Sequence, residues 1–310
     1  MSSDYFLYLE GLLKRRQDLR CVLLGSGESP EFTFYSPDSD IQTLFPLFSI
    51  TKSIVSLIAG MAYDRLGDVF LSKPFVRECR DYLMTNYDVR WELLSIHHLL
   101  SQTSGLKWRE MGRPWGPKNP LWEMEHQHDW LRFLFSRGFS SSPGKHFNYS
   151  SGISHLIPFL IGRFLKCDPT AFVAEDFLFP LGIDRFQWDL DPQGNLCGGK
   201  GLSLRAQDLW AIGKLVVRKG RYSSHRIISN AWFDLSMSKQ SHGIPFYGDY
   251  GYQWWIRENG IVAAIGFGGQ YLFIDSFTEK VGVFLGHLNK NAFADPQKLF
   301  LRYLGNPPGQ

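Results

Sequence analysis

The sequence has little cysteine and no long uninterrupted hydrophobic segment. Its 310 residues include four cysteines, Cys21, Cys79, Cys167 and Cys197, none at the close Cys/Cys or Cys/His spacing of a metal site. In a chain of this length we expect buried free thiols, although an even number leaves disulfides open. No apolar stretch could span a bilayer and the N-terminus has no signal-peptide core, so we expect a soluble, cytoplasmic protein.

An excess of charge of one sign is also missing. The chain has 33 Lys and Arg against 30 Asp and Glu, a formal net charge of +3. It contains no basic stripe and no phosphate loop of the GxxxxGK[ST] type, so nothing in it argues for nucleic acid or an anionic membrane as a partner. The pairs His97-His98 and His126-x-His128 lack a third ligand at sensible spacing, and we expect neither a metal nor a cofactor.

The apolar pattern predicts strands near both ends of the chain and helices between them. The predicted strands are 20–24, 31–35, 251–257, 261–265, 271–275 and 281–285. The simplest architecture is an α+β fold, with an antiparallel sheet built from both termini and flanked by helices. Residues 1–70 and 195–310 would form this sheet-containing domain and 71–194 an inserted, mostly helical domain, with the active site at their interface.

Ser-x-x-Lys occurs four times, so context must separate the copies. The four pairs are Ser49/Lys52, Ser104/Lys107, Ser142/Lys145 and Ser236/Lys239. A helix brings positions i and i+3 together, but glycine or Pro-Gly follows two of these serines and Ser236 lies late in its predicted helix. Only Ser49 opens a long apolar helix, where burial would lower the pKa of Lys52. Ser49 is therefore the candidate nucleophile, and a helix cap followed by a surface lysine is the alternative.

Further blocks extend the match beyond this tetrad. They include FSITKSIVSLIAGMAYDRLGD, HHLLSQTSGLKWRE, PGKHFNYSSGISHLIPFLIG, GGKGLSLRAQDLWAIGKLVV and GFGGQYLFID, in this order. Together the blocks resemble the serine beta-lactamase and penicillin-binding-protein-like family, in its class C beta-lactamase, esterase and 6-aminohexanoate-oligomer hydrolase branch. The resemblance implies a beta-lactamase/transpeptidase-like fold and a hydrolase that forms an acyl-enzyme on Ser49.

The resemblance also assigns roles to residues around Ser49. Tyr149 matches the tyrosine of the family's Tyr-x-Asn motif, which implies a general base or proton relay, as a tyrosinate whose pKa a neighbouring lysine lowers. Ser151 stands where the family has asparagine, and its hydroxyl can still accept a hydrogen bond from Lys52.

The family's Lys-Thr-Gly motif is matched only in part, by Ala264-Ile265-Gly266. The missing basic residue deprives an anionic beta-lactam of a charge-assisted contact. Gly266 still permits close backbone approach, and the N–H groups of Ser49 and Phe267 would form the oxyanion hole. The rival frame Gly266-Phe267-Gly268 would move the second donor to Gly269.

These features predict a serine hydrolase with an ester or small amide as its partner. An apolar cleft would be lined by Trp108, Trp115, Trp254, Trp255 and Phe267. Three alternatives remain: a beta-lactamase, a DD-peptidase, or a non-catalytic binding protein of the same fold. The oligomeric state stays open.

Overall fold

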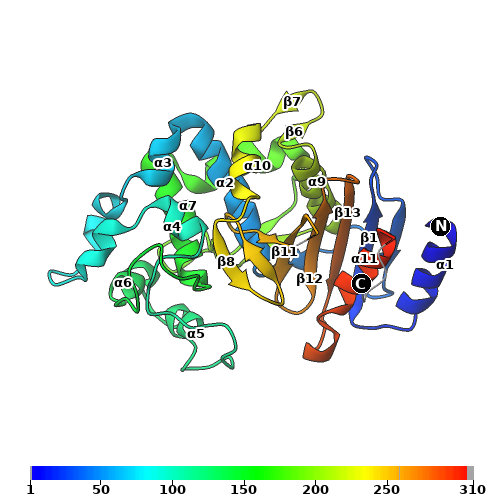
Figure 1. Ribbon diagram of the computed structural model, residues 1–310, viewed down its shortest axis with the longest axis horizontal. Coiled ribbons are helices and arrows are strands. Elements are labelled where there is room, and N and C mark those ends of the chain that lie inside the picture. The colour runs from blue at the N-terminus through cyan, green and yellow to red at the C-terminus, as the bar shows by residue number, and fades with distance from the viewer. Residues whose placement is uncertain (1, 258, 306–310) are drawn as a thin grey trace.

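The computed structural model describes residues 2–257 and 259–305. Its centre is an eight-stranded antiparallel sheet in the order β2-β1-β13-β12-β11-β10-β9-β8 (Figure 1). Strands from the two ends of the chain lie side by side near one edge of the sheet, where Val22 of β1 pairs with Phe284 of β13. The antiparallel sheet built from both termini is thus confirmed.

The strands and helices have the following bounds. The strands of the large sheet are β1 (Leu19–Gly25), β2 (Phe32–Tyr35), β8 (Ser241–Ile244), β9 (Gly248–Tyr250), β10 (Trp255–Ile256), β11 (Ile261–Gly266), β12 (Gln270–Asp275) and β13 (Lys280–Gly286). Smaller sheets contain β3 (Phe45–Pro46), β4 (Gln187–Trp188), β5 (Leu202–Leu204), β6 (Arg221–Tyr222) and β7 (His225–Arg226). The α-helices are α1 (Ser2–Leu13), α2 (Ile50–Leu66), α3 (Asp68–Ser72), α4 (Ile96–Leu100), α5 (Pro120–Glu125), α6 (Trp130–Phe135), α7 (Ser151–Leu165), α8 (Pro169–Ala171), α9 (Ala206–Val217), α10 (Asn230–Ser236) and α11 (Asp295–Tyr303). Short 3-10 or π segments are η1 (Val76–Tyr82), η2 (Val89–Leu93), η3 (Phe172–Leu178), η4 (Phe179–Leu181) and η5 (Lys290–Ala292).

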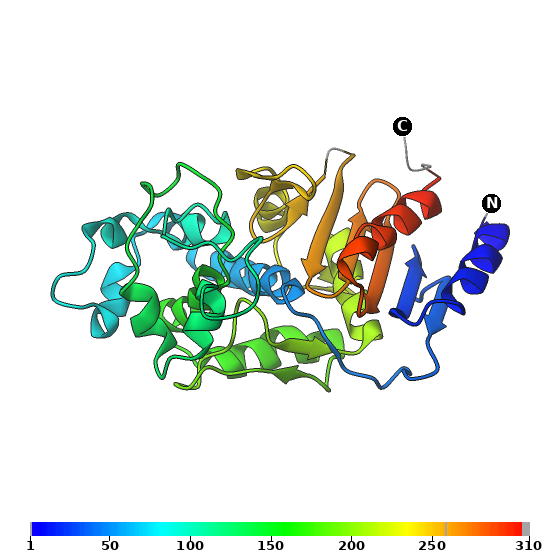
Figure 2. The same cartoon turned by 90° about the horizontal axis from the view of Figure 1, so that it is seen from below.

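Two apolar cores lie on the two faces of the large sheet. Alternate residues of β13 divide between them, with Val281, Val283 and Leu285 on one side and Phe284 on the other. The first core includes α2 and α9, and the second includes α1 and α11; α9 and α11 lie on opposite faces in Figure 2. The helices therefore flank the sheet as the sequence predicts.

Helix α2 lies where the sheet meets the helical part of the chain (Figure 1). It contacts β11 and β12 as well as α7. Its residues from Ile50 to Ala62 are all buried, including the polar Thr51, Lys52 and Ser53. Such burial on every side is typical of a helix in the centre of a large protein. Side chains at the start of α2 therefore lie between the large sheet and the helical part of the chain.

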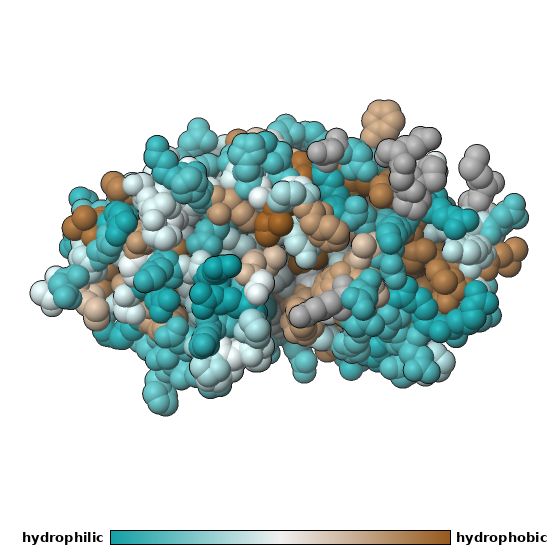
Figure 3. All heavy atoms as spheres, turned by 60° about the horizontal axis from the view of Figure 1, so that its bottom comes forward, coloured by the Kyte–Doolittle hydropathy of each residue, from teal (hydrophilic) through white to brown (hydrophobic). Residues whose placement is uncertain are grey.

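Surface and thiol chemistry complete the description of the fold. Within the described ranges no helix combines the length and apolar character needed to cross a bilayer. Figure 3 shows a surface in which hydrophobic side chains are interspersed among hydrophilic ones. All four cysteines are free, and Cys167 is exposed whereas the other three are buried. The expectation of buried thiols is thus wrong for Cys167.

Candidate active site

Ser49 occupies the turn between β3 and α2. The preceding residue, Phe48, has φ of 48°, a left-handed conformation that is strained for an aromatic residue. Ser49 is the N-cap residue of α2, but its side chain makes no capping hydrogen bond. Its hydroxyl, which is partly exposed, is therefore free to meet a substrate at the positive end of a 17-residue helix.

Lys52 lies one turn further along α2 and is almost completely buried. Its Nζ donates hydrogen bonds to Ser49 Oγ at 3.2 Å, to Ser151 Oγ at 2.9 Å and to the Gly199 carbonyl at 2.6 Å. Burial lowers the pKa of Lys52 from its usual 10.5 to about 8; Lys200 lowers it further and Glu110 opposes both effects. Roughly one molecule in ten therefore carries a neutral amine at pH 7.

The other Ser-x-x-Lys pairs lack this geometry. Lys107 and Lys145 are exposed, and Lys239 forms an ion pair with Asp249 at 2.9 Å. Among the described residues, a hydrogen bond between the serine and lysine side chains of a tetrad occurs only at Ser49 and Lys52. The structure therefore brings together the pair that helix position selects.

Tyr149 lies directly beside the lysine. Lys52 Nζ is 4.7 Å from the centre of the Tyr149 ring, and Trp255 stacks on the same ring at 5.9 Å and an interplanar angle of 18°. Burial and the Glu110 carboxylate raise the pKa of Tyr149 above its usual 10, against a smaller lowering by Ser49. This direction of the pKa shift argues against the expected tyrosinate and favours a neutral phenol at Tyr149.

Glu110 is a site residue that the sequence analysis missed. Its carboxylate accepts hydrogen bonds from Ser151 Oγ at 2.7 Å, from Ser151 N–H at 2.9 Å and from Trp108 Nε1 at 2.7 Å. It thus lies at the N-terminus of α7, where the helix dipole favours an anion. Ser49, Lys52, Ser151 and Glu110 form one continuous hydrogen-bonded chain. The block LKWRE contains Glu110, but no spacing links it to Ser151, 41 positions later.

The turn between β11 and β12 approaches the start of α2 closely. A Cβ on Gly266 would lie 2.2 Å from the Leu47 carbonyl oxygen, so a larger residue does not fit there. Phe267, which follows it, contacts Phe48 edge-to-face at 5.8 Å between ring centres. Within the described part of the chain, the N–H groups of Ser49 and Phe267 make no hydrogen bond. Both N–H groups thus lack a partner, as the donors of an oxyanion hole must, and their assignment to one stays a prediction.

The rest of this turn lies further from the nucleophile. Gly268 and Gly269 have φ of 74° and 95°, and the Gly268 carbonyl accepts from Leu288 N–H at 2.7 Å. A Cβ on Gly269 would meet Leu288, whereas one on Gly266 would meet Leu47, two residues before Ser49. This geometry favours the frame with Phe267 as donor over the frame with Gly269.

The predicted aromatic cleft is only partly assembled. Trp254 is completely buried in the core that contains α2, so its proposed place in a substrate cleft is wrong. Because successive strand residues face opposite sides, Trp255 instead contacts Tyr149. Phe267 is 70% exposed, Trp115 is exposed, and Trp108 is buried with its indole N–H on Glu110.

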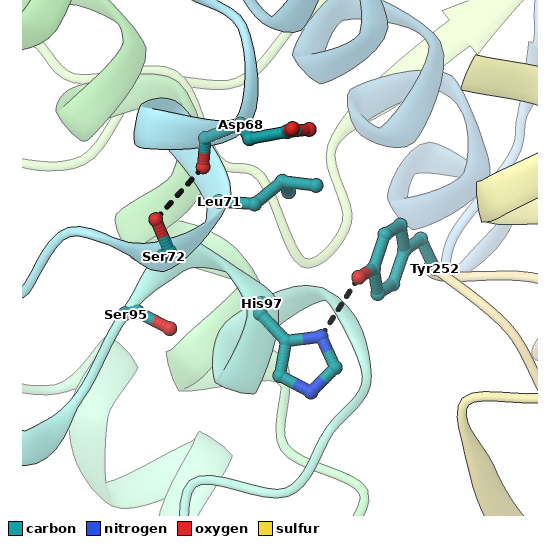
Figure 4. Close-up of a pocket in the computed structure, with 6 residues that line it drawn as sticks. All are labelled: Asp68, Leu71, Ser72, Ser95, His97 and Tyr252. Carbon is teal, nitrogen blue, oxygen red and sulfur yellow. Dashed lines mark hydrogen bonds between the residues drawn. The ribbon is translucent and has the colours of Figure 1, made fainter. Parts of the chain in front are cut away.

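The histidine pairs have structural contacts. His97 Nδ1 lies 2.7 Å from the Tyr252 hydroxyl, at a hollow of about 410 Å³ (Figure 4). His98 caps α4 through Ser95, and His126 Nδ1 contacts the Trp122 carbonyl. Neither Ser49 nor Lys52 lines the hollow at His97. Within the described residues, no three His, Cys, Asp or Glu side chains are grouped as a metal would need.

The arrangement of a serine, a buried lysine and a tyrosine on these elements agrees with sequence comparison. The sequence model of the family described as Beta-lactamase matches residues 35–304. This chain belongs to the Beta-lactamase family. The match extends the resemblance beyond the blocks read from the sequence, and it includes every candidate site residue.

Solved structures confirm the beta-lactamase/transpeptidase-like fold. A protein from Bacillus anthracis described as a 6-aminohexanoate-dimer hydrolase has a TM-score of 0.80 and 17% identity, covering 97% of this chain and 83% of that one. The hydrolase EstCE1, with promiscuous acyltransferase activity, has a TM-score of 0.75 and 16% identity over 96% and 97% of the two chains. A D-stereospecific amidohydrolase from Streptomyces sp. has a TM-score of 0.71 and 14% identity, covering 97% of this chain and 98% of that one. No curated protein matches the sequence.

Proposed function

We propose that this Beta-lactamase family member is a serine hydrolase that forms an acyl-enzyme on Ser49 and acts on an ester or small amide. The observation that carries the proposal is the buried Lys52, whose amine contacts Ser49 Oγ at 3.2 Å and has a pKa of about 8. A lysine made this acidic by burial can accept the serine proton near neutral pH. The alternative, a helix cap followed by a surface lysine, would show neither the contact with Ser49 Oγ nor the lowered pKa.

In the proposed acylation, the Ser49 proton passes to Lys52 Nζ as Ser49 Oγ bonds to the substrate carbonyl carbon. The oxygen of the tetrahedral intermediate accepts hydrogen bonds from the N–H groups of Ser49 and Phe267. The bond to the leaving alkoxide or amine then breaks, and that group takes up a proton from Lys52, directly or through the Tyr149 hydroxyl. Water then attacks the acyl carbon as it loses a proton to Lys52, directly or through the Tyr149 hydroxyl. The bond between the acyl carbon and Ser49 Oγ breaks, and Ser49 Oγ takes up that proton.

Ser49→Ala tests this proposal. We expect the variant to lose about 10³-fold or more of kcat on 4-nitrophenyl butyrate, because the nucleophile is removed. Mass spectrometry after reaction with a fluorophosphonate is expected to locate one adduct, on Ser49, in the wild-type protein. Ser56→Ala is the matched control, since Ser56 is a buried serine of α2 whose hydroxyl has no hydrogen-bond partner among the described residues. Full activity in Ser49→Ala, or an adduct elsewhere, would refute the proposal.

Ester or amide substrates are favoured over beta-lactams. Ala264 is completely buried in β11 and provides no cation beside the nucleophile. An anionic lactam therefore lacks the charge-assisted contact that a lysine or histidine there would supply. Nitrocefin turnover as fast as ester turnover in the same assay would contradict this preference.

Glu110→Gln is expected to move the pH profile of kcat/KM to lower pH. The Glu110 carboxylate raises the pKa of Lys52, so its removal lowers that pKa below about 8. The neutral amine then appears at lower pH, and the rise of activity with pH begins earlier. At the plateau we expect about tenfold lower kcat, because an amide cannot accept both hydrogen bonds from Ser151.

The control for this charge change is Glu175→Gln, an exposed position of η3. It removes the same charge without touching Ser151, so the profile should keep its wild-type midpoint. A Glu110→Gln profile that coincides with wild type, or shifts to higher pH, would show that Glu110 does not act on Lys52.

A further inference from the structure

A second hollow, of about 620 Å³, has a strongly basic lining. Its wall comes from the loop before α5 together with α5 itself, from Arg137 just after α6, and from the segment that leads into Tyr149. The charged residues of this wall are Lys107, Arg109, Arg113, Lys118, Glu123 and Arg137. We call this hollow the basic pocket.

The basic pocket has far more positive charge than its own acidic group can neutralise. Five lysine and arginine side chains face a single carboxylate, Glu123, which pairs with Arg137 at 3.4 Å. Within the described residues, no carboxylate lies at ion-pair distance from Lys107, Arg109, Arg113 or Lys118. The pocket's excess of four charges exceeds the net +3 of the entire chain, so the remainder is nearly neutral.

The basic pocket shares its wall with the candidate active site. Trp108 lines the pocket, and its indole N–H donates to Glu110 at 2.7 Å. Phe147 also lines it and packs against Trp255 at 5.9 Å and Tyr149 at 6.5 Å. Two side chains thus separate the cations from the residues around Ser49. In Figure 3, strongly hydrophilic side chains gather near the middle of the face that is turned toward the viewer, on the side of the helical region.

Hydrogen bonds join the segments that form the pocket. Asn148 Nδ2 donates to the Leu106 carbonyl at 2.9 Å, and Lys107 N–H donates to the Gly138 carbonyl at 2.8 Å. The three parts of the wall are thereby tied to one another. The cations therefore surround a preformed hollow, which lowers the entropic cost of binding an anion there.

We propose that the basic pocket binds an anionic group, a carboxylate or a phosphate, of the substrate that Ser49 hydrolyses. Guanidinium groups present paired N–H donors that match the oxygens of both anions. An unneutralised basic hollow also attracts anions from solution and raises their local concentration. The inference rests on the proposed function, and it defines the substrate class as an acidic ester or amide rather than a neutral one.

Two pairs of esters, each pair similar in size but different in charge, test the inference. On the acyl side, 4-nitrophenyl pentanoate is compared with 4-nitrophenyl hydrogen glutarate; on the leaving-group side, phenyl acetate is compared with 4-acetoxybenzoate. The variant Lys107→Gln/Arg109→Gln removes two exposed cations of the pocket. The control Arg15→Gln/Arg221→Gln removes two exposed arginines outside the pocket, one in the turn after α1 and one on β6.

For at least one pair, we expect wild type to prefer the anionic ester and the pocket variant to lose about tenfold of that preference. Its kcat/KM for the neutral ester should stay within about twofold of wild type, because the removed side chains act on charge alone. Added salt should lower the wild-type preference and leave the variant nearly unaffected. Equal preference in wild type and pocket variant for both pairs would overturn the inference.

Binding to Ser49→Ala separates failure of this inference from failure of the proposed function. Calorimetric titration with glutarate and with inorganic phosphate should show salt-sensitive binding that the added Lys107→Gln/Arg109→Gln changes abolish. The anion that binds more tightly identifies the group. If Ser49→Ala binds an anion but hydrolyses esters like wild type, the proposed function fails and the anion site stands. If wild type hydrolyses esters by Ser49 but no anion binds and no preference appears, the pocket inference fails.

Discussion

Lys52→Met is expected to abolish ester hydrolysis and, at the same time, to change how the stability of the protein depends on pH. Removal of the amine takes away the acceptor for the Ser49 proton, so kcat should fall by about 10³-fold or more. Methionine keeps the unbranched shape and most of the length of the lysine side chain, and it carries no charge. The variant therefore separates the effect of Lys52 on catalysis from the cost in stability of burying its charged amine.

The stability part follows from the pKa of Lys52. In the folded protein this pKa is about 8, against a usual value of 10.5. Between these values the unfolded chain binds a proton that the folded chain does not, so the Lys52 contribution to wild-type stability rises with pH. The stability of Lys52→Met relative to that of wild type should thus be highest below pH 8. Its advantage should shrink by about 2 kcal/mol between pH 8 and pH 10.

Guanidinium unfolding of both proteins at several pH values measures this difference. The substitution leaves the Gly199 carbonyl without its hydrogen bond from Lys52. This lowers the free energy of unfolding of the variant by the same amount at every pH, so it does not change how the difference between the two proteins depends on pH. Lys145→Met, at an exposed lysine, is the control and should show no such slope. A flat difference for Lys52→Met would mean that Lys52 is not deprotonated by burial.

Gly266→Ala is expected to cost about 100-fold in kcat or more. The new Cβ would lie 2.2 Å from the Leu47 carbonyl oxygen, and neither backbone can yield cheaply. The β11–β12 turn must then move away from the start of α2, carrying the Phe267 N–H away from the substrate oxygen. Loss of one oxyanion-hole donor has an effect of this size in other hydrolases.

Gly11→Ala provides the matched control, because a Cβ on Gly11 meets nothing within 4 Å and α1 favours alanine. Its kcat should equal that of wild type and its stability should not fall. Retention of wild-type kcat by Gly266→Ala would remove the Phe267 N–H from the mechanism. Thermal unfolding of both variants distinguishes a displaced turn from a protein that fails to fold.

Local pattern predicted much of the fold. The segments 20–24 and 281–285 alternate or remain apolar in ways that specify strands, and β1 and β13 lie there. Helix position also selected Ser49 among four tetrads, since an i, i+3 pair needs only one element to bring it together. By contrast, β8 at Ser241–Ile244 was not predicted, because this partly exposed edge strand lacks a clear alternation.

Features that join distant segments escaped prediction. Glu110 acts on a serine 41 residues away, and only the folded chain places them together. The cations of the basic pocket are spread from Lys107 to Arg137, so they form no run in a sequence that is balanced overall. Trp254 and Trp255 are adjacent, and the face that each occupies depends on strand register. The neutral phenol of Tyr149 depends on burial, which its motif does not state.

The pairing of β1 with β13 has a consequence for how the protein folds. Val22 and Phe284 are neighbours in the sheet although 262 positions separate them. Closing so long a loop is entropically costly and is expected to be slow. The β11–β12 turn that borders Ser49 belongs to this late part of the chain. During synthesis, α2 and Tyr149 therefore emerge well before the turn that must face them. We expect no fragment that ends before β12 to acylate, so the proposed nucleophile Ser49 would stay unreactive until β12 has been made.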